Sequence, residues 1–392
     1  MQFDRGYLSP YFATDTDTRW TSTTAPTGEN FVSDSTSCLV SGILNKDTKT
    51  PTENSGRGAM EIHANAYVKL TVGGQEIAVM MENSSVVYSL KSVMQTLNSR
   101  YAAELTGAAV LSDNARKAAA FYNTWANDGM GDWGLSNFQT YVQDNYILDQ
   151  DVLYHGRTYE KNGVQWFNWS ASGFTVQLQG SGLTAEIASN APNATNYAYL
   201  KVYVDGEEQT DILLDKTKQT VTLAENLDPN ATHTVEVRKR NSPRSSTAGL
   251  VSMEVVNGKK LAPPAAKDML IEFVGDSLTV GYSAADTNKA ETAWSTKTED
   301  GTKTYSKQVA DAFNADYMVT AISGRGVVMN NQNDGAPWFP DIYPKLDYYN
   351  DSETNYDFAL QPDVIVINLG TNDATNSGLD IATFKAGVVN FI

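Results

Sequence analysis

Three short motifs in the last third of the sequence carry residues suited to nucleophilic catalysis. In Gly275-Asp-Ser277, an apolar run ends in a tight turn that would place the serine at the start of a helix. A serine in that position can attack a carbonyl carbon, and its backbone N–H can point at the oxyanion that forms. We therefore predict that Ser277 is a nucleophile.

Two later motifs offer further hydrogen-bond donors for the same oxyanion. Gly324, within Ser323-Gly-Arg-Gly326, exposes its backbone N–H because glycine has no side chain to block a substrate. Asn372, within Asn368-Leu-Gly-Thr-Asn-Asp373, offers its side-chain amide. Removing one such donor typically costs about 2.7–4 kcal/mol of transition-state stabilisation. We predict that Gly324 and Asn372 complete an oxyanion hole.

Each of these motifs directly follows a predicted β-strand. Continuous apolar runs occupy residues 269–274, 317–322 and 364–368, and residues 305–313 have the pattern of an amphipathic helix. Apolar strands separated by helices are typical of a parallel sheet that is buried on both faces. Since active sites of such sheets lie at the carboxyl ends of the strands, the three motifs should meet at one edge.

The preceding segment, residues 151–262, has the pattern of a β-sandwich. Short alternating strands are separated by Gly, Asp and Asn turns at intervals of about 8–12 residues. Phe174, Val176 and Leu178, for example, share one face of a strand. We expect two packed antiparallel sheets with a jelly-roll-like architecture, joined by a Pro-rich linker over residues 261–266 to the α/β domain of residues 267–392.

The order and spacing of the three motifs resemble those of the SGNH, or GDSL-type, hydrolases, with Ser277, Gly324 and Asn372 in the first three blocks. A sandwich joined directly to such a domain is similar to carbohydrate esterase family two, over residues 151–392. This resemblance implies a secreted bacterial enzyme that removes acetyl groups from polysaccharides such as xylan or glucomannan and needs no metal or cofactor. The start of the chain shows no basic and apolar regions of a secretory signal.

A serine hydroxyl needs a base to take its proton, and the family resemblance places that base in a later Asp-x-x-His block. No such block is present, and the three histidines, His63, His155 and His233, all precede Ser277. We expect a truncated α/β domain whose base lies beyond Ile392, with low activity and poor stability in the 392-residue form.

A second hypothesis is a non-catalytic carbohydrate-binding protein or degenerate esterase. It depends on the missing base and on five aromatic residues of the sandwich, which either fill the framework or stack on sugars: Trp166, Phe167, Trp169, Tyr199 and Tyr203. His233 alternates in register with Val235 and Val237, so the pattern predicts a buried, hydrogen-bonded ring for it.

The charge composition argues against nucleic acid and membranes as partners. The 392 residues carry 46 Asp and Glu against 29 Lys and Arg, a net charge of −17 that would repel phosphate backbones and anionic lipids. No apolar run approaches the roughly 20 residues needed to span a bilayer. The single cysteine, Cys38, excludes an internal disulfide and a cysteine-based metal site.

The first 150 residues show no catalytic pattern. Residues 1–27 have the composition of an extended or disordered lead, and Met1 to Phe12 resembles an apical-domain segment of the group I chaperonins that nothing later continues. Residues 28–150 predict a small α+β region with a hairpin at residues 66–81. Helical spacing is expected from Tyr88 to Tyr101 and from Ala118 to Trp125.

Overall fold

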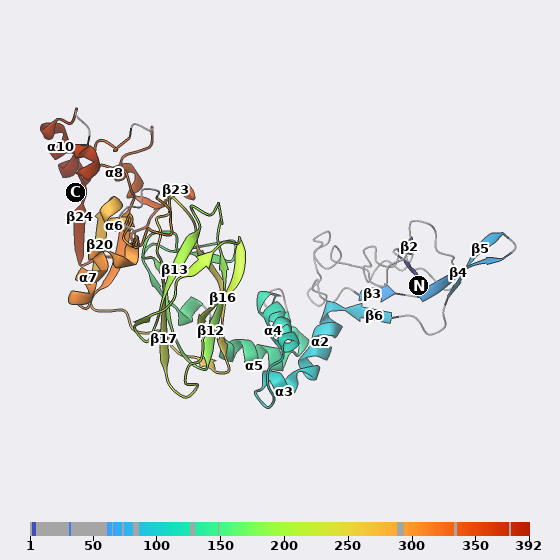
Figure 1. Ribbon diagram of the computed structural model, residues 1–392. Helices are drawn as coiled ribbons and strands as arrows, with labels where there is room; N and C mark the ends of the chain where they lie inside the picture. The colour runs from blue at the N-terminus through green and yellow to red at the C-terminus, as the bar shows by residue number, and fades with distance from the viewer. Residues whose placement is uncertain are drawn as a thin grey trace. The chain divides into compact units, whose positions relative to one another are not determined.

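The computed structural model describes residues 2–4, 31–32, 61–64, 66–72, 74–80, 86–125, 130–147, 149–287, 294–332, 335–375 and 378–392. The chain divides into two compact units, residues 1–143 and 144–392 (Figure 1). Cys38 and most of the predicted lead, with its chaperonin-like segment, lie outside the described residues.

The first unit contains β-strands followed by helices. Strands β4 and β5 form the predicted hairpin, with Val72 paired to Gln75, and their sheet has the order β2-β1-β4-β5. Tyr88 was expected in a helix but lies in a strand, because β6 pairs with β3 before α2 begins. The strands are β1 Gln2–Asp4, β2 Phe31–Val32, β3 Glu61–Ala64, β4 Ala66–Val72, β5 Gln75–Met80 and β6 Val86–Ser89. The helices are α2 Leu90–Arg100, α3 Ala102–Leu105, α4 Asp113–Trp125, the 3-10 helix Met130–Trp133 and α5 Ser136–Asn145.

The second unit begins with two antiparallel sheets that pack face to face, which confirms the predicted sandwich. One sheet has the order β16-β12-β18-β10-β9 and the other β14-β13-β17-β11-β19. β7 precedes the predicted boundary at residue 151 and already pairs with β18. The strands are β7 Tyr146–Ile147, β8 Leu153–His155, β9 Tyr159–Lys161, β10 Val164–Trp166, β11 Gly173–Gln179, β12 Gly182–Ala188, β13 Ala198–Val204, β14 Glu207–Glu208, β15 Ile212–Leu214, β16 Lys218–Ala224, β17 His233–Lys239, β18 Gly249–Val256 and β19 Lys259–Lys260.

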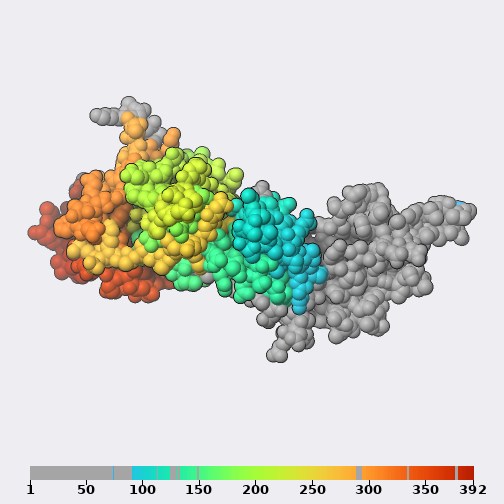
Figure 2. Space-filling model, turned by 90° about the horizontal axis from the view of Figure 1, so that it is seen from below, coloured from blue at the N-terminus to red at the C-terminus, as the bar shows by residue number. Residues whose placement is uncertain are grey.

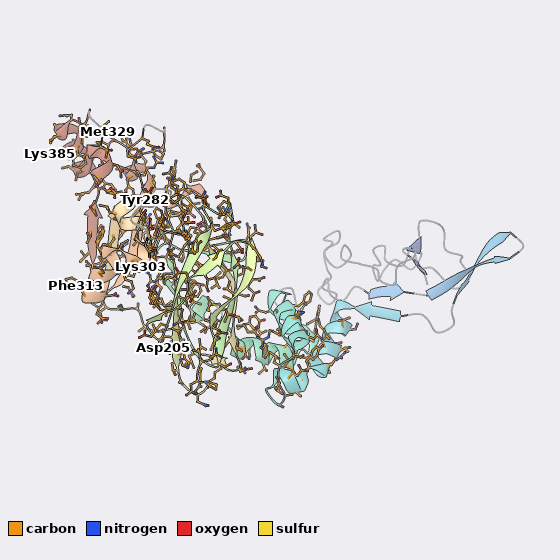
Figure 3. The ribbon with its side chains drawn as sticks, viewed as in Figure 1. Asp205, Tyr282, Lys303, Phe313, Met329 and Lys385 are labelled. Atoms are coloured by element: carbon orange, nitrogen blue, oxygen red, sulfur yellow. The ribbon has the colours of Figure 1, made fainter. Side chains whose placement is uncertain are left out.

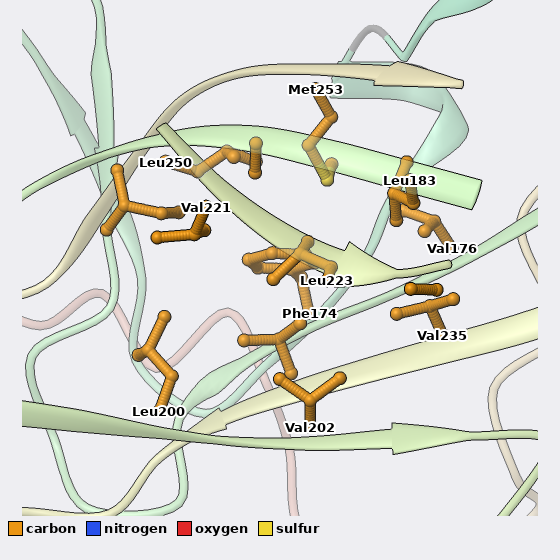
Figure 4. Packing of buried hydrophobic residues seen from close by; sticks show 14 of the residues in the cluster. Phe174, Val176, Leu183, Leu200, Val202, Val221, Leu223, Val235, Leu250 and Met253 are labelled. Carbon is orange, nitrogen blue, oxygen red and sulfur yellow. The ribbon is translucent and has the colours of Figure 1, made fainter. Parts of the chain in front are cut away.

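The sandwich core consists of the inward-facing residues of both sheets. Phe174, Val176 and Leu178 of β11 are completely buried, as their alternation predicted. They meet residues of the opposite sheet such as Leu183 and Leu250 (Figure 4). A residue-by-residue alternation of this kind buries one face of each strand and leaves the other face for solvent or a second layer.

The remainder of the second unit is an α/β domain around a parallel sheet of order β21-β20-β24. The three strands match the predicted apolar runs within one residue at each end, and α7 matches the predicted amphipathic helix. A hairpin of β22 and β23 was not predicted. The elements are β20 Leu270–Gly275, α6 Ser277–Val280, the 3-10 helix Gly301–Lys303, α7 Tyr305–Ala312, β21 Asp316–Ala321, α8 Phe339–Ile342, β22 Lys345–Asp347, β23 Asp351–Asn355, β24 Val364–Asn368, α9 Thr371–Ala374 and α10 Ile381–Phe391.

The prediction that all three parallel strands are buried is wrong for β24. Val364, Ile365 and Ile367 are 44%, 50% and 40% exposed, whereas the apolar side chains of β20 are almost all buried. An edge position alone is not the reason, because within the described residues β21 also pairs with β20 alone and is buried. Ala310 of α7 and Arg238 of the sandwich pack against β21, whereas Val366 is the described residue of β24 that packs against this core cluster.

The sandwich and the α/β domain share a buried interface, and their surfaces are continuous in Figure 2, green and yellow against orange and red. Trp169, from the segment between β10 and β11, is 1% exposed and packs against Val274 and Ile322 of the α/β domain. Arg157 of the sandwich forms a buried ion pair with Glu272 of β20 at 3.3 Å. The sandwich is therefore part of the support for the central strand.

Candidate active site

The register of the parallel sheet brings the three predicted motifs to the same edge. Gly275, the last residue of β20, pairs with Ala321 of β21 and with Asn368 of β24. The loops that carry Ser277, Gly324 and Asn372 therefore all leave from the carboxyl ends of adjacent strands, as the sequence predicted.

Ser277 is the first residue of α6. Asp276 caps this helix, because its side chain accepts a hydrogen bond from the backbone N–H of Leu278 at 3.1 Å. Gly275 has no room for a side chain, since a Cβ would lie 2.0 Å from the Thr279 hydroxyl oxygen. The strand therefore turns into the helix within one residue, and Ser277 is partly exposed at that turn.

Asn372 connects the three motifs through its side-chain amide. The amide nitrogen lies 3.2 Å from Asp276 Oδ2 and 2.8 Å from the Arg325 carbonyl oxygen, and Asn372 is 5% exposed. These two acceptors fix the orientation of the amide beside the residue that precedes Ser277. Burial, together with the nearby Asp373 carboxylate, raises the pKa of Asp276.

The second motif contains two glycines that the backbone requires. Gly324 has a φ of +83°, and a Cβ there would lie 3.0 Å from Asn331 Oδ1. A Cβ at Gly326 would lie 1.9 Å from the Met329 carbonyl oxygen and 2.5 Å from Asp373 Oδ2. The close approach of backbone and carboxylate at Gly326 explains the second glycine of the motif.

Asp373 is a residue of the site that the sequence analysis missed. Its carboxylate is fully buried and accepts hydrogen bonds from the backbone N–H groups of Val327, Val328 and Met329 at 2.8–2.9 Å. It thereby orders the loop that follows Gly324. The signal in the sequence was the position of Asp373 directly after Asn372. Two adjacent polar residues at a strand end can form hydrogen bonds with two different loops.

The two histidines of the second unit form hydrogen bonds with residues other than Ser277. His155 is 6% exposed, and its Nε2 lies 2.7 Å from the Thr175 hydroxyl. Burial lowers its pKa well below the usual value, and the charges of Arg238 and Lys267 act in the same direction. Because Lys267 precedes β20 whereas Ser277 follows it, His155 lies toward the opposite end of the strand.

His233 is buried and hydrogen-bonded, as its register predicted. Its Nδ1 lies 2.7 Å from Asp205 Oδ2 and its Nε2 lies 2.9 Å from the Asp228 carbonyl oxygen. The hydrogen bond with Asp205 raises the pKa of His233. Asp205 lies in the turn between β13 and β14, well away from the label of Met329 on the second motif's loop in Figure 3. His63 lies in β3, and its side chain is outside the described residues.

The aromatic residues of the sandwich are mainly framework. Phe167 and Trp169 are 0% and 1% exposed, which excludes them as a sugar platform. The ring of Tyr199 lies 5.1 Å from the Arg240 guanidinium, and that of Tyr203 lies 5.5 Å from the Lys307 ammonium. The partly exposed Trp166 closes over Gly249, where a Cβ would lie 2.8 Å from its ring.

Two classes of feature are not found in the described part of the chain. Within it, no helix is long and apolar enough to cross a membrane. The same described ranges hold no group of three or more His, Cys, Asp or Glu side chains that could bind a metal ion.

This arrangement provides part of what nucleophilic acyl transfer requires. It offers a serine at a helix start, a glycine with positive φ on the neighbouring loop and a fixed amide on the third. Donors that are already held in place stabilise a developing oxyanion without reorganisation.

The comparison with protein families agrees with this division of the second unit. Residues 154–264 match the family described as carbohydrate esterase 2 N-terminal, which corresponds to the sandwich. Residues 271–392 match the family described as GDSL-like lipase/acylhydrolase, which corresponds to the parallel sheet and its loops.

Curated relatives and a solved structure cover the same part of the chain. The cellulase/esterase CelE of Acetivibrio thermocellus is 31% identical over 257 residues, 64% of this chain and 30% of the relative. An acetylxylan esterase/glucomannan deacetylase of Cellvibrio japonicus is 29% identical over 222 residues, 56% of this chain and 59% of the relative. The chain thus spans less than two thirds of the length of these two relatives. The structure of a family two carbohydrate esterase from Clostridium thermocellum in complex with cellohexaose has 30% identity and a TM-score of 0.56, over 61% of this chain and 71% of that one.

Proposed function

We propose that this chain is a carbohydrate O-acetyl esterase of the family two type, because its sandwich and its parallel-sheet domain match the two family models and resemble the solved family two esterase. Its substrates in this proposal are acetyl esters on sugar hydroxyls of plant polysaccharides such as xylan or glucomannan. The names of the Cellvibrio japonicus relatives support this substrate class. A secreted location follows from the same substrate class, since such polymers lie outside the cell.

The proposed reaction begins with attack of Ser277 Oγ on the acetyl carbonyl carbon. The tetrahedral oxyanion accepts hydrogen bonds from the N–H of Ser277, the N–H of Gly324 and the amide of Asn372. The carbon–oxygen bond to the sugar then breaks, and the sugar oxygen takes up a proton. Water hydrolyses the acetyl-serine and releases acetate, which restores the free hydroxyl of Ser277.

The observation that carries this proposal is the side-chain hydrogen bond between the first and third motifs. Asn372 is hydrogen-bonded to Asp276, the residue directly before the nucleophile, across 96 positions of sequence. A structural turn at Gly275-Asp-Ser277 would not require an amide from the adjacent strand end. For donation to an oxyanion, the amide must exchange or share one of its two present acceptors, Asp276 and Arg325.

The proton acceptor for Ser277 is not His155 or His233 in this proposal. Both rings already have short hydrogen bonds to other groups, and His155 lies toward the amino end of β20. A histidine from another part of the protein would serve as base and then as acid for the leaving sugar.

Release of acetate from acetylated xylan tests the function. Ser277→Ala is expected to abolish release, whereas Ser283→Ala, a serine of the following loop with a φ of +58°, serves as a control that should retain turnover. Near-wild-type turnover by Ser277→Ala would refute the proposal.

A second candidate function is glycan binding without catalysis. It is favoured by the engagement of both histidines of the second unit away from Ser277. Calorimetric titration with xylo- and manno-oligosaccharides separates the two functions. Binding without acetate release from any acetylated ligand would favour this candidate over the esterase.

A further inference from the structure

Tyr282 lies one helical turn after Ser277, and its ring is stacked on a second aromatic residue. Its backbone N–H donates to the Ser277 carbonyl oxygen at 2.9 Å, so it lies one turn beyond the nucleophile at the end of α6. The ring stacks on Trp294, with centroids 6.1 Å apart and planes inclined by 16°. Tyr282 is nevertheless 49% exposed. Because Trp294 covers one face of the ring, the exposed area belongs mainly to the other face and the edge.

The residues that follow Trp294 are hydrogen-bonded back to the residues that directly follow α6. The Asp300 N–H donates to the Gly281 carbonyl oxygen at 3.0 Å, and the Ala285 N–H donates to the Thr298 carbonyl oxygen at 2.9 Å. Gly281 has a φ of +76°, and a Cβ there would lie 2.1 Å from the Asp300 carbonyl oxygen. These contacts close the base of the loop directly after α6.

The sandwich holds the returning part of this loop through two polar side chains. The Asn241 amide donates to the carbonyl oxygens of Thr296 and Glu299 at 2.8 and 3.1 Å. The Arg240 guanidinium donates to the Lys297 carbonyl oxygen at 2.9 Å and forms an ion pair with the fully buried Asp300 at 3.0 Å. Asn241 and Arg240 are 0% and 3% exposed, so this support is rigid and shielded from water.

Glu299 extends the support to Trp294. Its carboxylate accepts a hydrogen bond from the Ser242 N–H at 2.6 Å and faces the buried ammonium of Lys239. The indole of Trp294 lies close enough to this carboxylate to lower its pKa, against the larger effect of burial, although the indole N–H forms no regular hydrogen bond there. Trp294 is thereby placed against the sandwich side of the loop, and its ring backs that of Tyr282.

We propose that Tyr282, backed by Trp294, is a stacking platform for a pyranose ring of the polysaccharide next to the acetylated position. A sugar ring presents apolar C–H groups on its face, and a rigid, half-exposed aromatic ring offers the complementary surface at little entropic cost. The exposed Leu278, directly after Ser277 and 59% exposed, extends the apolar surface beside the nucleophile. This subsite rests on the proposed carbohydrate substrate.

Calorimetric titration of the full chain with xylohexaose and mannohexaose tests the platform without requiring turnover. Tyr282→Ala is expected to weaken binding about 3- to 10-fold, and Tyr282→Phe, which keeps the ring, to stay within about twofold of the wild type. Trp294→Leu should weaken binding in the same direction, because the tyrosine ring loses its backing.

Phe313→Ala is the matched control. Phe313 is an aromatic residue that is 65% exposed and follows α7, at the opposite end of the strands from Tyr282 (Figure 3). It should bind both sugars like the wild type. If Tyr282→Ala does not fold by circular dichroism, Tyr282→Leu retains an apolar contact with Trp294 and gives the same comparison.

Unchanged affinity in a folded Tyr282→Ala or Tyr282→Leu variant overturns the platform, and so does the absence of binding by the wild-type chain to either sugar. Sugar binding that depends on Tyr282 in a chain that releases no acetate would refute the esterase but support the platform. Acetate release by a chain whose sugar affinity does not depend on Tyr282 would support the esterase but refute the platform.

Discussion

The side-chain amide of Asn372 lies 3.2 Å from the carboxylate of Asp276, so the third motif is hydrogen-bonded to the residue that precedes Ser277. The same amide nitrogen lies 2.8 Å from the Arg325 carbonyl oxygen on the second loop. One buried side chain thereby connects all three loops, and its removal should disturb the position of Ser277.

Asn372→Ala should reduce kcat for acetyl-ester hydrolysis by about 10²–10³ while changing KM little, because an oxyanion donor acts mainly in the transition state. Asn372→Asp should reduce kcat at least as much, since the aspartate side chain has no N–H groups and adds a charge beside Asp276. Steady-state kinetics on an acetylated xylo-oligosaccharide measure both. If kcat/KM fell only because KM rose, with kcat unchanged, the result would contradict an oxyanion role.

Gly324→Ala should lower both kcat and stability. The residue has a φ of +83°, where an L-residue costs roughly 1–2 kcal/mol, and its Cβ would press on Asn331 Oδ1 at 3.0 Å. Gly335→Ala is the matched control, because Gly335 has a φ of +69° with no atom within 4 Å of the added Cβ. We expect both variants to unfold at lower temperature and only Gly324→Ala to lose turnover. A kcat for Gly324→Ala equal to that of Gly335→Ala would remove Gly324 from the oxyanion hole.

The sequence predicted where the strands end better than it predicted the long-range side-chain contacts that hold those strands in place. Apolar runs are local patterns, so β20, β21 and β24 could be placed within one residue, and glycine and polar residues directly after them marked the loops. Arg157 and Arg240 gave no such signal. Each is buried against residues more than 50 positions away, and a single arginine in a sequence does not reveal its partner.

Tyr88 shows the same limit at shorter range. Its spacing to Val93 and Leu97 fits a helix, but pairing of β6 with β3 gives its backbone hydrogen bonds in a strand. The exposure of β24 also could not be read from the run Val364 to Asn368, because burial depends on which elements flank the strand. Local pattern thus located the site, and long-range packing determined how it is held.

Glu272→Gln should destabilise the second unit by about 3–5 kcal/mol, because it leaves the buried Arg157 guanidinium without its counter-charge. Glu272 also accepts hydrogen bonds from the hydroxyls of Thr320 and Tyr343 at 2.7 Å, and four aromatic rings surround Arg157. Urea denaturation followed by near-UV circular dichroism measures the change.

The exposed pair of Lys161 and Asp351 is the control for this loss. These side chains are also 3.3 Å apart and join the same two layers, but they are 51% and 21% exposed. Lys161→Met should therefore change stability by only about 0–1 kcal/mol. A similarly small change for Glu272→Gln would show that the buried pair does not hold the sandwich to the sheet.

His155 should make the second unit less stable as the pH falls. Burial depresses its pKa in the folded state, so the unfolded chain binds a proton first, and stability is lost as the pH falls below about 6.5, the usual value for histidine. His155→Gln keeps a polar group for Thr175 and should flatten the decline of the urea midpoint between pH 8 and 5. An unchanged pH dependence in this variant would contradict the assignment.

His233 should contribute with the opposite sign. Its hydrogen bond with Asp205 raises the folded pKa, so the stabilisation is fully present below the unfolded pKa and is lost as the pH rises through the folded value. His233→Gln should therefore lose stability mainly at the acidic end of the same titration. A larger loss for this variant at pH 8 than at pH 5 would contradict the ion pair.

Free imidazole should accelerate acetate release by the chain in a manner that depends on Ser277. Neither His155 nor His233 is placed to take the proton of the serine hydroxyl, and imidazole titrates near neutral pH, where a general base is most effective. The rate on acetylated xylo-oligosaccharide should rise in proportion to the neutral imidazole concentration. Ser277→Ala gives the background reaction of imidazole with the ester, which is subtracted. A Ser277-dependent rate that is already high and insensitive to imidazole would show that the serine has a resident base, and the search for it would then begin with His63 and the carboxylates of the three loops.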